Sequence, residues 1–183
     1  MVKQVLFIHS AGPQGEQQGS SRLLKYLNDE LGSDFRLLAP KMPTPEDPKY
    51  PEWKQVLKEE IASLEDGAIL LGHSIGGSAL LKFLSEEELG KSFAKVITIA
   101  APYWGIDENW QLKDFELAED FSARSSLLPD AVLFHSIDDE IVPFEHLEKY
   151  MESLPGATVR QLSGKDHIFQ DGLPEAIEEI RLG

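Results

Sequence analysis

Short apolar runs alternate along the chain with longer stretches in which apolar residues recur at helical spacing. Runs of about four to eight apolar residues are typical of buried strands, and the alternation with helices is typical of βαβ units around a parallel sheet. The predicted strands lie near Gln4–His9, Phe35–Ala39, Ala68–His73, Lys95–Ala100, Ala131–Ser136 and Thr158–Leu162. The predicted helices lie near Ser21–Leu31, Pro51–Leu64, Ile75–Leu84, Pro143–Leu154 and Leu173–Leu182. The pattern predicts an α/β protein.

Composition narrows the possible partners. The 183 residues include 32 acidic and 17 basic side chains, for a formal net charge of −15. Such a balance argues against nucleic acid and anionic membranes as partners, because both are negatively charged and bind clusters of Lys and Arg. The chain has no cysteine, which excludes disulfides, thiolate nucleophiles and cysteine-ligated metals. The apolar start is too short for a signal peptide and no run could span a membrane, so we expect a cytoplasmic protein.

The most informative segment is Gly72-His73-Ser74-Ile75-Gly76-Gly77. It follows a predicted strand and opens a predicted helix, and strand, G-x-S-x-G, helix is the layout of the nucleophile elbow of α/β-hydrolases. A serine on so sharp a turn has a strained backbone, and large side chains two residues before and after it would collide with neighbouring backbone. The segment therefore predicts that Ser74 is a catalytic nucleophile.

A serine nucleophile needs a histidine base and an orienting carboxylate, and in α/β-hydrolases they follow in the order Ser, acid, His. His167 lies in the loop after the last predicted strand, where the base is expected. The acid is expected after the strand before it. Asp139 stands four residues before Pro143, the spacing that many hydrolases show, whereas Asp138 is one residue off. We predict Asp139 as the acid, with Asp138 as the alternative.

An oxyanion hole needs two backbone N–H groups. We expect one from Ile75 and the other from the loop after the first strand, at Ala11 or Ser10, with Ala11 preferred. Ser10 and His73 are further candidates for contacts with substrate. So are two aromatic residues of a later loop, Tyr103 and Trp104. The histidines at strand ends lack carboxylates at ligand spacing, so we expect no metal and no cofactor.

The long connection Pro102–Pro129 does not fit the alternation of strands and helices. It combines several aromatic side chains with many acids, and a connection of this length is usually functional. We expect one domain spanning residues 1–183, with a short lid-like segment at about 102–129 above Ser74.

With these residues in hand, the chain resembles the small α/β-hydrolase-fold serine hydrolases related to YdeN and to retinoblastoma-binding protein nine. Besides the elbow, three stretches carry the resemblance, and it runs nearly end to end. They are Met42-Pro43-Thr44-Pro45 with Glu52-Trp53, Asp138-Asp139-Glu140-Ile141-Val142-Pro143-Phe144, and Gly164-Lys165-Asp166-His167.

The resemblance implies a reduced α/β-hydrolase fold, and a triad of Ser74, Asp139 and His167. The expected architecture is a three-layer α/β/α sandwich with a mainly parallel six-stranded sheet in the order 2-1-3-4-5-6. The expected reaction is carboxylesterase-like cleavage of small esters or activated acyl groups through an acyl-enzyme intermediate. One alternative is a hydrolase-fold protein that acts mainly by binding a protein partner, and another is a peptidase or amidase. A homodimer contact through the aromatic loop is also open.

Overall fold

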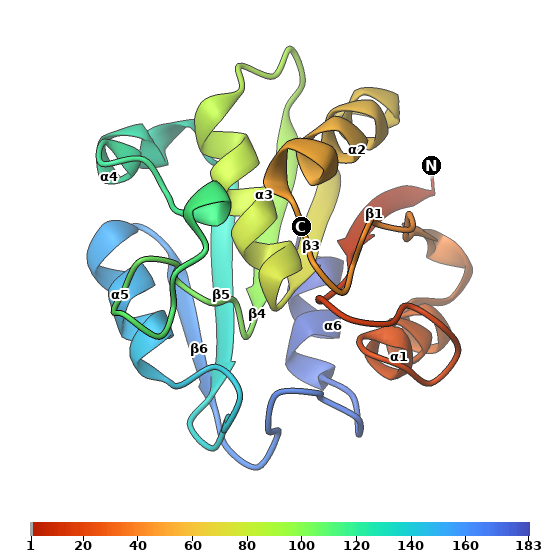
Figure 1. Cartoon of the computed structure of the whole chain (residues 1–183). Coiled ribbons are helices and arrows are strands. Elements are labelled where there is room, and N and C mark those ends of the chain that lie inside the picture. The colour runs from red at the N-terminus through yellow and green to blue at the C-terminus, as the bar shows by residue number, and fades with distance from the viewer. Residues whose placement is uncertain (1) are drawn as a thin grey trace.

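The computed structural model describes residues 2–183, which contain one six-stranded sheet in the order β2-β1-β3-β4-β5-β6 (Figure 1). This confirms the order expected from the sequence, and all five strand pairings are parallel. The strands are β1 (Lys3–Ile8), β2 (Phe35–Leu38), β3 (Ala68–His73), β4 (Phe93–Ile99), β5 (Asp130–Ser136) and β6 (Thr158–Leu162).

Five longer helices connect or flank these strands. They are α1 (Ser21–Leu31), α2 (Tyr50–Ser63), α3 (Ile75–Glu86), α5 (Glu145–Ser153) and α6 (Pro174–Leu182). The short elements are α4 (Phe121–Arg124) and the 3-10 turns η1 (Gly32–Asp34), η2 (Lys113–Phe115) and η3 (Ser125–Leu127). Within residues 2–183 no helix is long and apolar enough to cross a membrane.

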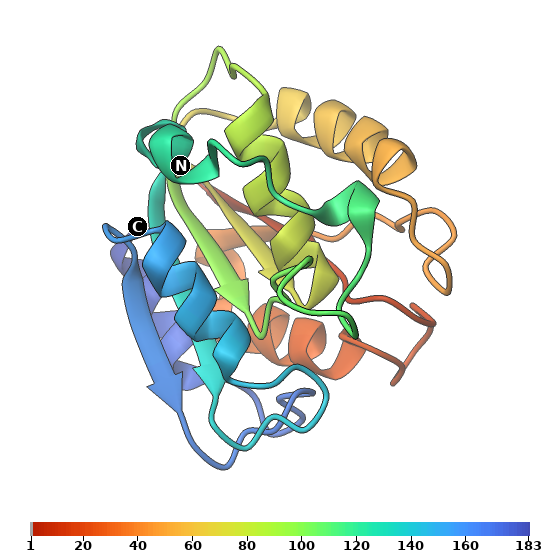
Figure 2. The ribbon, with the colours of Figure 1, turned by 60° about the vertical axis from the view of Figure 1, so that its left-hand side comes forward.

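The helices form a layer on each face of the sheet, as the alternation of side chains along the strands requires (Figures 1 and 2). On β1, Leu6 and Ile8 contribute to a core with α2, α3 and α5. Val5 and Phe7 point to the opposite face and contribute to a second core with α1 and α6. The predicted three-layer α/β fold is confirmed.

The connection between β4 and β5 packs against the outside of the α2–α3 layer. Phe115 and Phe121 are buried in the larger core. The Phe115 ring meets those of Trp53 and Tyr50 edge to face, with centroids 5.8 and 5.5 Å apart. These aromatic residues of the long connection therefore help to fill the core.

The parallel sheet sets the position of the functional residues. All six strands point the same way, so their carboxyl ends meet at one edge (Figure 1). The chain leaves β1 toward β2 on one side, while β3 continues the sheet on the other. Ligands of open α/β sheets bind at such a switch point, outside the carboxyl ends of the strands.

Candidate active site

Ser74 occupies the turn between β3 and α3, with φ 54° and ψ −128°. A serine with this backbone geometry is strained by about 1–3 kcal/mol and needs a surrounding structure that enforces it. Part of that enforcement is a hydrogen bond from the Ser74 N–H to the carbonyl oxygen of Ile99 in the neighbouring strand, at 2.8 Å. The elbow geometry expected from the sequence is present.

The flanking glycines are required by close backbone approaches. A Cβ on Gly72 would lie 2.5 Å from backbone atoms of Gly76 and Gly77. A Cβ on Gly76 would lie 2.4 Å from the carbonyl oxygen of Ile8 in β1. The backbone of a packed helix or strand cannot move aside, so only glycine fits at both positions.

His167 lies in the loop after β6 and hydrogen-bonds to Asp139, in the loop after β5. The distance from His167 Nδ1 to Asp139 Oδ2 is 2.7 Å. A carboxylate accepts, so Nδ1 carries the proton and the neutral ring keeps its lone pair on Nε2. In the described residues Nε2 has no hydrogen-bond partner, and His167 and Ser74 line the same cavity. The imidazole is thus arranged to accept a proton on the cavity side.

The carboxylate of Asp139 is completely buried, with 0% of its side chain exposed. Burial alone would raise its pKa, but hydrogen bonds from His167 and from the N–H groups of Ile141 and Val142 hold the pKa below its usual value. His135 Nε2 lies 3.5 Å from the same carboxylate and donates to the carbonyl oxygen of Val142 at 2.8 Å. The aspartate therefore remains an anion fixed in one orientation.

Asp138, the alternative acid, has different partners. Its Oδ1 accepts from the Ser136 hydroxyl at 2.5 Å and from the Gly164 N–H at 2.7 Å, and Oδ2 accepts from the Asp166 N–H at 3.2 Å. These bonds, chiefly the one from Ser136, lower the pKa of Asp138 to about 2. Asp138 thus ties the loop after β5 to the loop that carries His167, and does not contact the imidazole.

A buried hydrogen-bond chain connects three loops beneath the cavity. His73 Nε2 lies 2.8 Å from the carbonyl oxygen of His167, and its Nδ1 lies 2.8 Å from Ser20 Oγ. A carbonyl only accepts, so Nε2 carries the proton and Nδ1 accepts from the Ser20 hydroxyl. Ser20 Oγ accepts in turn from the Ser10 N–H at 2.8 Å. Burial in particular lowers the pKa of His73 to about 3 and keeps the ring neutral.

The cavity beside Ser74 has a volume of about 410 Å³. Of the candidate residues, it brings together Ser10, Ala11, His73, Ser74 and His167. The sequence analysis missed other residues that line it, and no local motif marks them: Gln17, Gly19, Arg22, Ile141, Ile168 and Gln170.

Tyr103 and Trp104 do not line this cavity. The Tyr103 backbone N–H donates to His146 Nδ1 at 2.9 Å, and the Tyr103 ring meets that of Tyr150 edge to face. The Trp104 ring lies against Trp110, with centroids 5.5 Å apart. Tyr103 therefore packs against α5, and Trp104 packs within the long connection.

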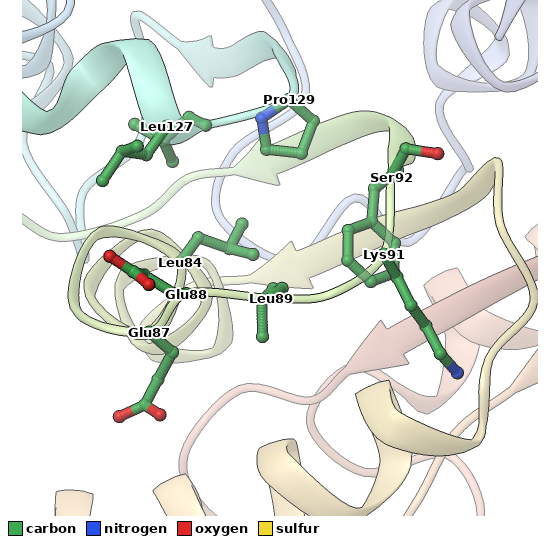
Figure 3. Close-up of a pocket in the computed structure, with 10 residues that line it drawn as sticks. Leu84, Glu87, Glu88, Leu89, Lys91, Ser92, Leu127 and Pro129 are labelled. Atoms are coloured by element: carbon green, nitrogen blue, oxygen red, sulfur yellow. The ribbon is translucent and has the colours of Figure 1, made fainter.

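A second cavity, of about 390 Å³, lies near the amino ends of β4 and β5, whereas Ser74 follows the carboxyl end of β3. Figure 3 shows residues that line this second cavity. Two of its three charged side chains have partners: Glu87 pairs with Lys54 at 2.7 Å, and Lys91 bonds to the carbonyl oxygens of Ala62 and Leu64. The lining consists of Leu84, Glu87, Glu88, Leu89, Lys91, Ser92, Phe93, Leu127, Leu128 and Pro129. This set contains no histidine and no nucleophile with a base beside it.

No group of three or more His, Asp or Glu side chains in residues 2–183 is arranged to hold a metal ion. His9, His73 and His135 all lie near strand ends, but each is buried among its own contacts.

The fold and the elbow define a serine hydrolase, and comparison with known families agrees. The model of the serine hydrolase family matches residues 22–180, and the chain belongs to that family. It is 25% identical over 173 residues to a protein named as a hydrolase, YdeN of Bacillus subtilis (strain 168), covering 93% of this chain and 88% of that protein.

Solved structures show the same fold. The crystal structure of the B. subtilis ydeN gene product superimposes with a TM-score of 0.83 at 21% identity, covering 98% of this chain and 97% of that one. The esterase domain of a Rhodothermus marinus protein gives a TM-score of 0.68 at 20% identity, covering 100% of this chain and 85% of that one.

Proposed function

We propose that this serine hydrolase cleaves small carboxylic esters or activated acyl groups, with Ser74 as nucleophile, His167 as general base and Asp139 as the orienting acid. The observation that carries the proposal is the 2.7 Å bond from His167 to a fully buried Asp139. That bond leaves Nε2 as a proton acceptor in the cavity that the strained Ser74 also lines.

In the first half-reaction, His167 Nε2 removes the proton from Ser74 Oγ as Oγ attacks the carbonyl carbon. The tetrahedral intermediate collapses, the ester C–O bond breaks, and the imidazolium gives its proton to the departing alcohol. In the second, His167 takes a proton from water, the hydroxide attacks the acyl-enzyme, and Ser74 leaves with that proton as the carboxylic acid is released. Asp139 stabilises the imidazolium that forms in each half.

The developing oxyanion needs donors that are not already engaged. Ser10 donates its N–H to Ser20 Oγ, so it is a poor candidate. The neighbouring Ala11 is exposed at the cavity, and the N–H of Ile75 belongs to the first turn of α3, whose dipole favours negative charge. We propose Ala11 and Ile75 as the two donors. One such donor is worth about a hundredfold to a thousandfold in kcat in other serine hydrolases.

A small ester is favoured as substrate by the size of the cavity. About 410 Å³ accommodates a small acyl group and its alcohol. The structural neighbour from R. marinus is an esterase domain, which is consistent with this substrate class.

A fluorophosphonate probe tests the proposal, because it labels only an activated serine. The purified protein is treated with the probe and its intact mass measured, with Ser74→Ala and His167→Ala beside it and the exposed Ser122→Ala as a matched control. We expect one label per chain in the wild type and in Ser122→Ala, and none in the other two. A folded wild type that takes no label and hydrolyses no p-nitrophenyl ester would contradict the proposal and favour a protein-binding role.

A further inference from the structure

Arg22, the second residue of α1, lines the cavity that contains Ser74 and His167. Its side chain is exposed, and its guanidinium makes one weak contact, from Nη1 to Gln170 Oε1 at 3.4 Å. In the described part of the chain it forms no ion pair with a carboxylate. Because a guanidinium has five N–H donors in a planar fork, most of its hydrogen-bonding capacity is unused.

The position of Arg22 distinguishes it from the other cations of this chain, which has a net charge of −15. Eight of the 17 Lys and Arg side chains pair with carboxylates within the described residues: Lys25, Lys49, Lys54, Lys82, Lys95, Lys149, Arg124 and Arg160. No Asp or Glu belongs to the lining of the catalytic cavity, and Asp139 lies beneath it with its own hydrogen bonds. Arg22 is thus the permanently charged side chain of the cavity wall.

The same cavity offers apolar surface beside the catalytic groups. Ile141 is 56% exposed and Ile168 is 43% exposed, and both line the cavity. Ile141 follows Asp139 by two residues, and Ile168 follows His167 directly. A ligand that fits this wall has an apolar part for the isoleucines and an anionic part for the guanidinium.

We propose that Arg22 makes the enzyme selective for esters that carry a second, carboxylate group near the scissile bond. The inference rests on the proposed function and names its substrate class. A guanidinium binds a carboxylate through two parallel hydrogen bonds, which fixes the orientation of the substrate as well as adding affinity. The net negative charge of the protein repels anions at long range, so an unpaired cation beside Ser74 gives the cavity a local preference that the rest of the surface lacks.

The test compares esters that differ in charge but little in shape. Mono-p-nitrophenyl adipate against p-nitrophenyl hexanoate places the carboxylate on the acyl side. p-Acetoxybenzoate against its methyl ester places it on the alcohol side. Each ester is measured with wild type, Arg22→Gln, Arg22→Lys and Arg36→Gln. The last variant removes the same charge from an exposed arginine on β2, outside the cavity.

We expect Arg22→Gln to lower kcat/KM for at least one anionic ester by about tenfold to a hundredfold, while the neutral partner changes by less than about twofold. Arg22→Lys should retain part of the preference, since it keeps the charge and loses the fork. Arg36→Gln should behave as wild type, and the wild-type preference should weaken at high ionic strength.

The outcomes separate the two proposals. If the wild type hydrolyses these esters and Arg22→Gln leaves the anionic-to-neutral ratio of kcat/KM unchanged in both pairs, the inference is wrong and the esterase proposal stands. An equal change in Arg36→Gln would also overturn it, because the effect would then come from net charge alone. If the folded wild type hydrolyses none of them and takes no fluorophosphonate label, both proposals fail together.

Discussion

His73 Nε2 donates a hydrogen bond to the backbone carbonyl oxygen of His167 at 2.8 Å, although 94 residues separate the two in the chain. The residue next to the proposed nucleophile therefore holds the loop that carries the proposed base. Through Ser20, the same imidazole also holds the loop after β1, where the oxyanion donor Ala11 is proposed. One neutral side chain thus sets the relative positions of three loops.

Removing the Ser20 hydroxyl tests this connection. Ser20→Ala leaves His73 Nδ1 and the Ser10 N–H without their partner, and an unsatisfied buried polar group costs about 1–3 kcal/mol. We expect kcat to fall by about tenfold with less change in KM, because the oxyanion donors are displaced more than the binding surface. Ester kinetics measure this. The exposed Ser122→Ala is the control, and Ser20→Thr, which keeps a hydroxyl, should recover activity. Equal rates in Ser20→Ala and wild type would refute the role.

Two adjacent aspartates provide a matched pair for the triad. Asp139→Asn removes the anion that orients His167, and we expect kcat to fall by about a thousandfold to ten-thousandfold. Asp138→Asn keeps one acceptor oxygen for the loop at Gly164, so the expected loss is below about tenfold. Steady-state kinetics on a p-nitrophenyl ester distinguish the two. A larger loss of kcat in Asp138→Asn than in Asp139→Asn would mean that Asp138, not Asp139, is the acid.

The lowered pKa of His73 predicts a specific dependence of stability on pH. The folded-state pKa is about 3 against an ordinary 6.5, so between these values the unfolded chain binds a proton here that the folded chain does not. Stability is therefore lost as the pH falls through this window, at about 1.4 kcal/mol per pH unit for one proton. Urea denaturation at several pH values measures the slope, which His73→Asn should reduce by that amount. Parallel slopes for the two proteins would contradict the assignment.

The elbow glycines predict a graded effect on folding. In Gly76→Ala the new Cβ meets the Ile8 carbonyl at 2.4 Å, and we expect a loss of about 3 kcal/mol or more in the free energy of unfolding. Gly77→Ala meets the Ala101 side chain at 2.9 Å and should cost less. Gly90→Ala, with nothing within 4 Å, is the neutral control. Urea midpoints rank the three, and Gly76→Ala matching Gly90→Ala would refute the close-approach argument.

Much of the fold could be predicted because its signals are local. Short apolar runs and helical spacing predict every strand and the five longer helices, and the strands β3 and β6 and helix α1 agree with the predicted bounds at both ends. The short elements between β4 and β5 were not predicted. A single turn such as η2 is too short to show a helical period, and its position depends on Phe115 packing onto Trp53.

The residues of the site also fall into two groups, those that a local motif reveals and those that only the folded chain brings together. The elbow is one continuous motif, and spacing to Pro143 favoured Asp139, the aspartate that the structure brings to His167. The cavity wall has no such local signal. Arg22 and Gln170 meet across 148 residues, and Ser20 and His73 across 53, so only the folded chain reveals these pairs. Tyr103 and Trp104 are aromatic residues in a long loop, and such residues suit core packing as well as substrate contact.

The backbone of Ser74 has a consequence for how this protein can change over time. Glycine adopts a φ of 54° without steric cost, unlike serine. Glycine at position 74 would therefore relieve the strain but remove the proposed nucleophile. Stability and catalysis therefore favour different residues at this one position. A lineage released from the need for hydrolysis would gain stability by losing the serine while keeping the rest of the elbow. The identity of residue 74 in any descendant is then a direct record of whether selection for turnover persisted.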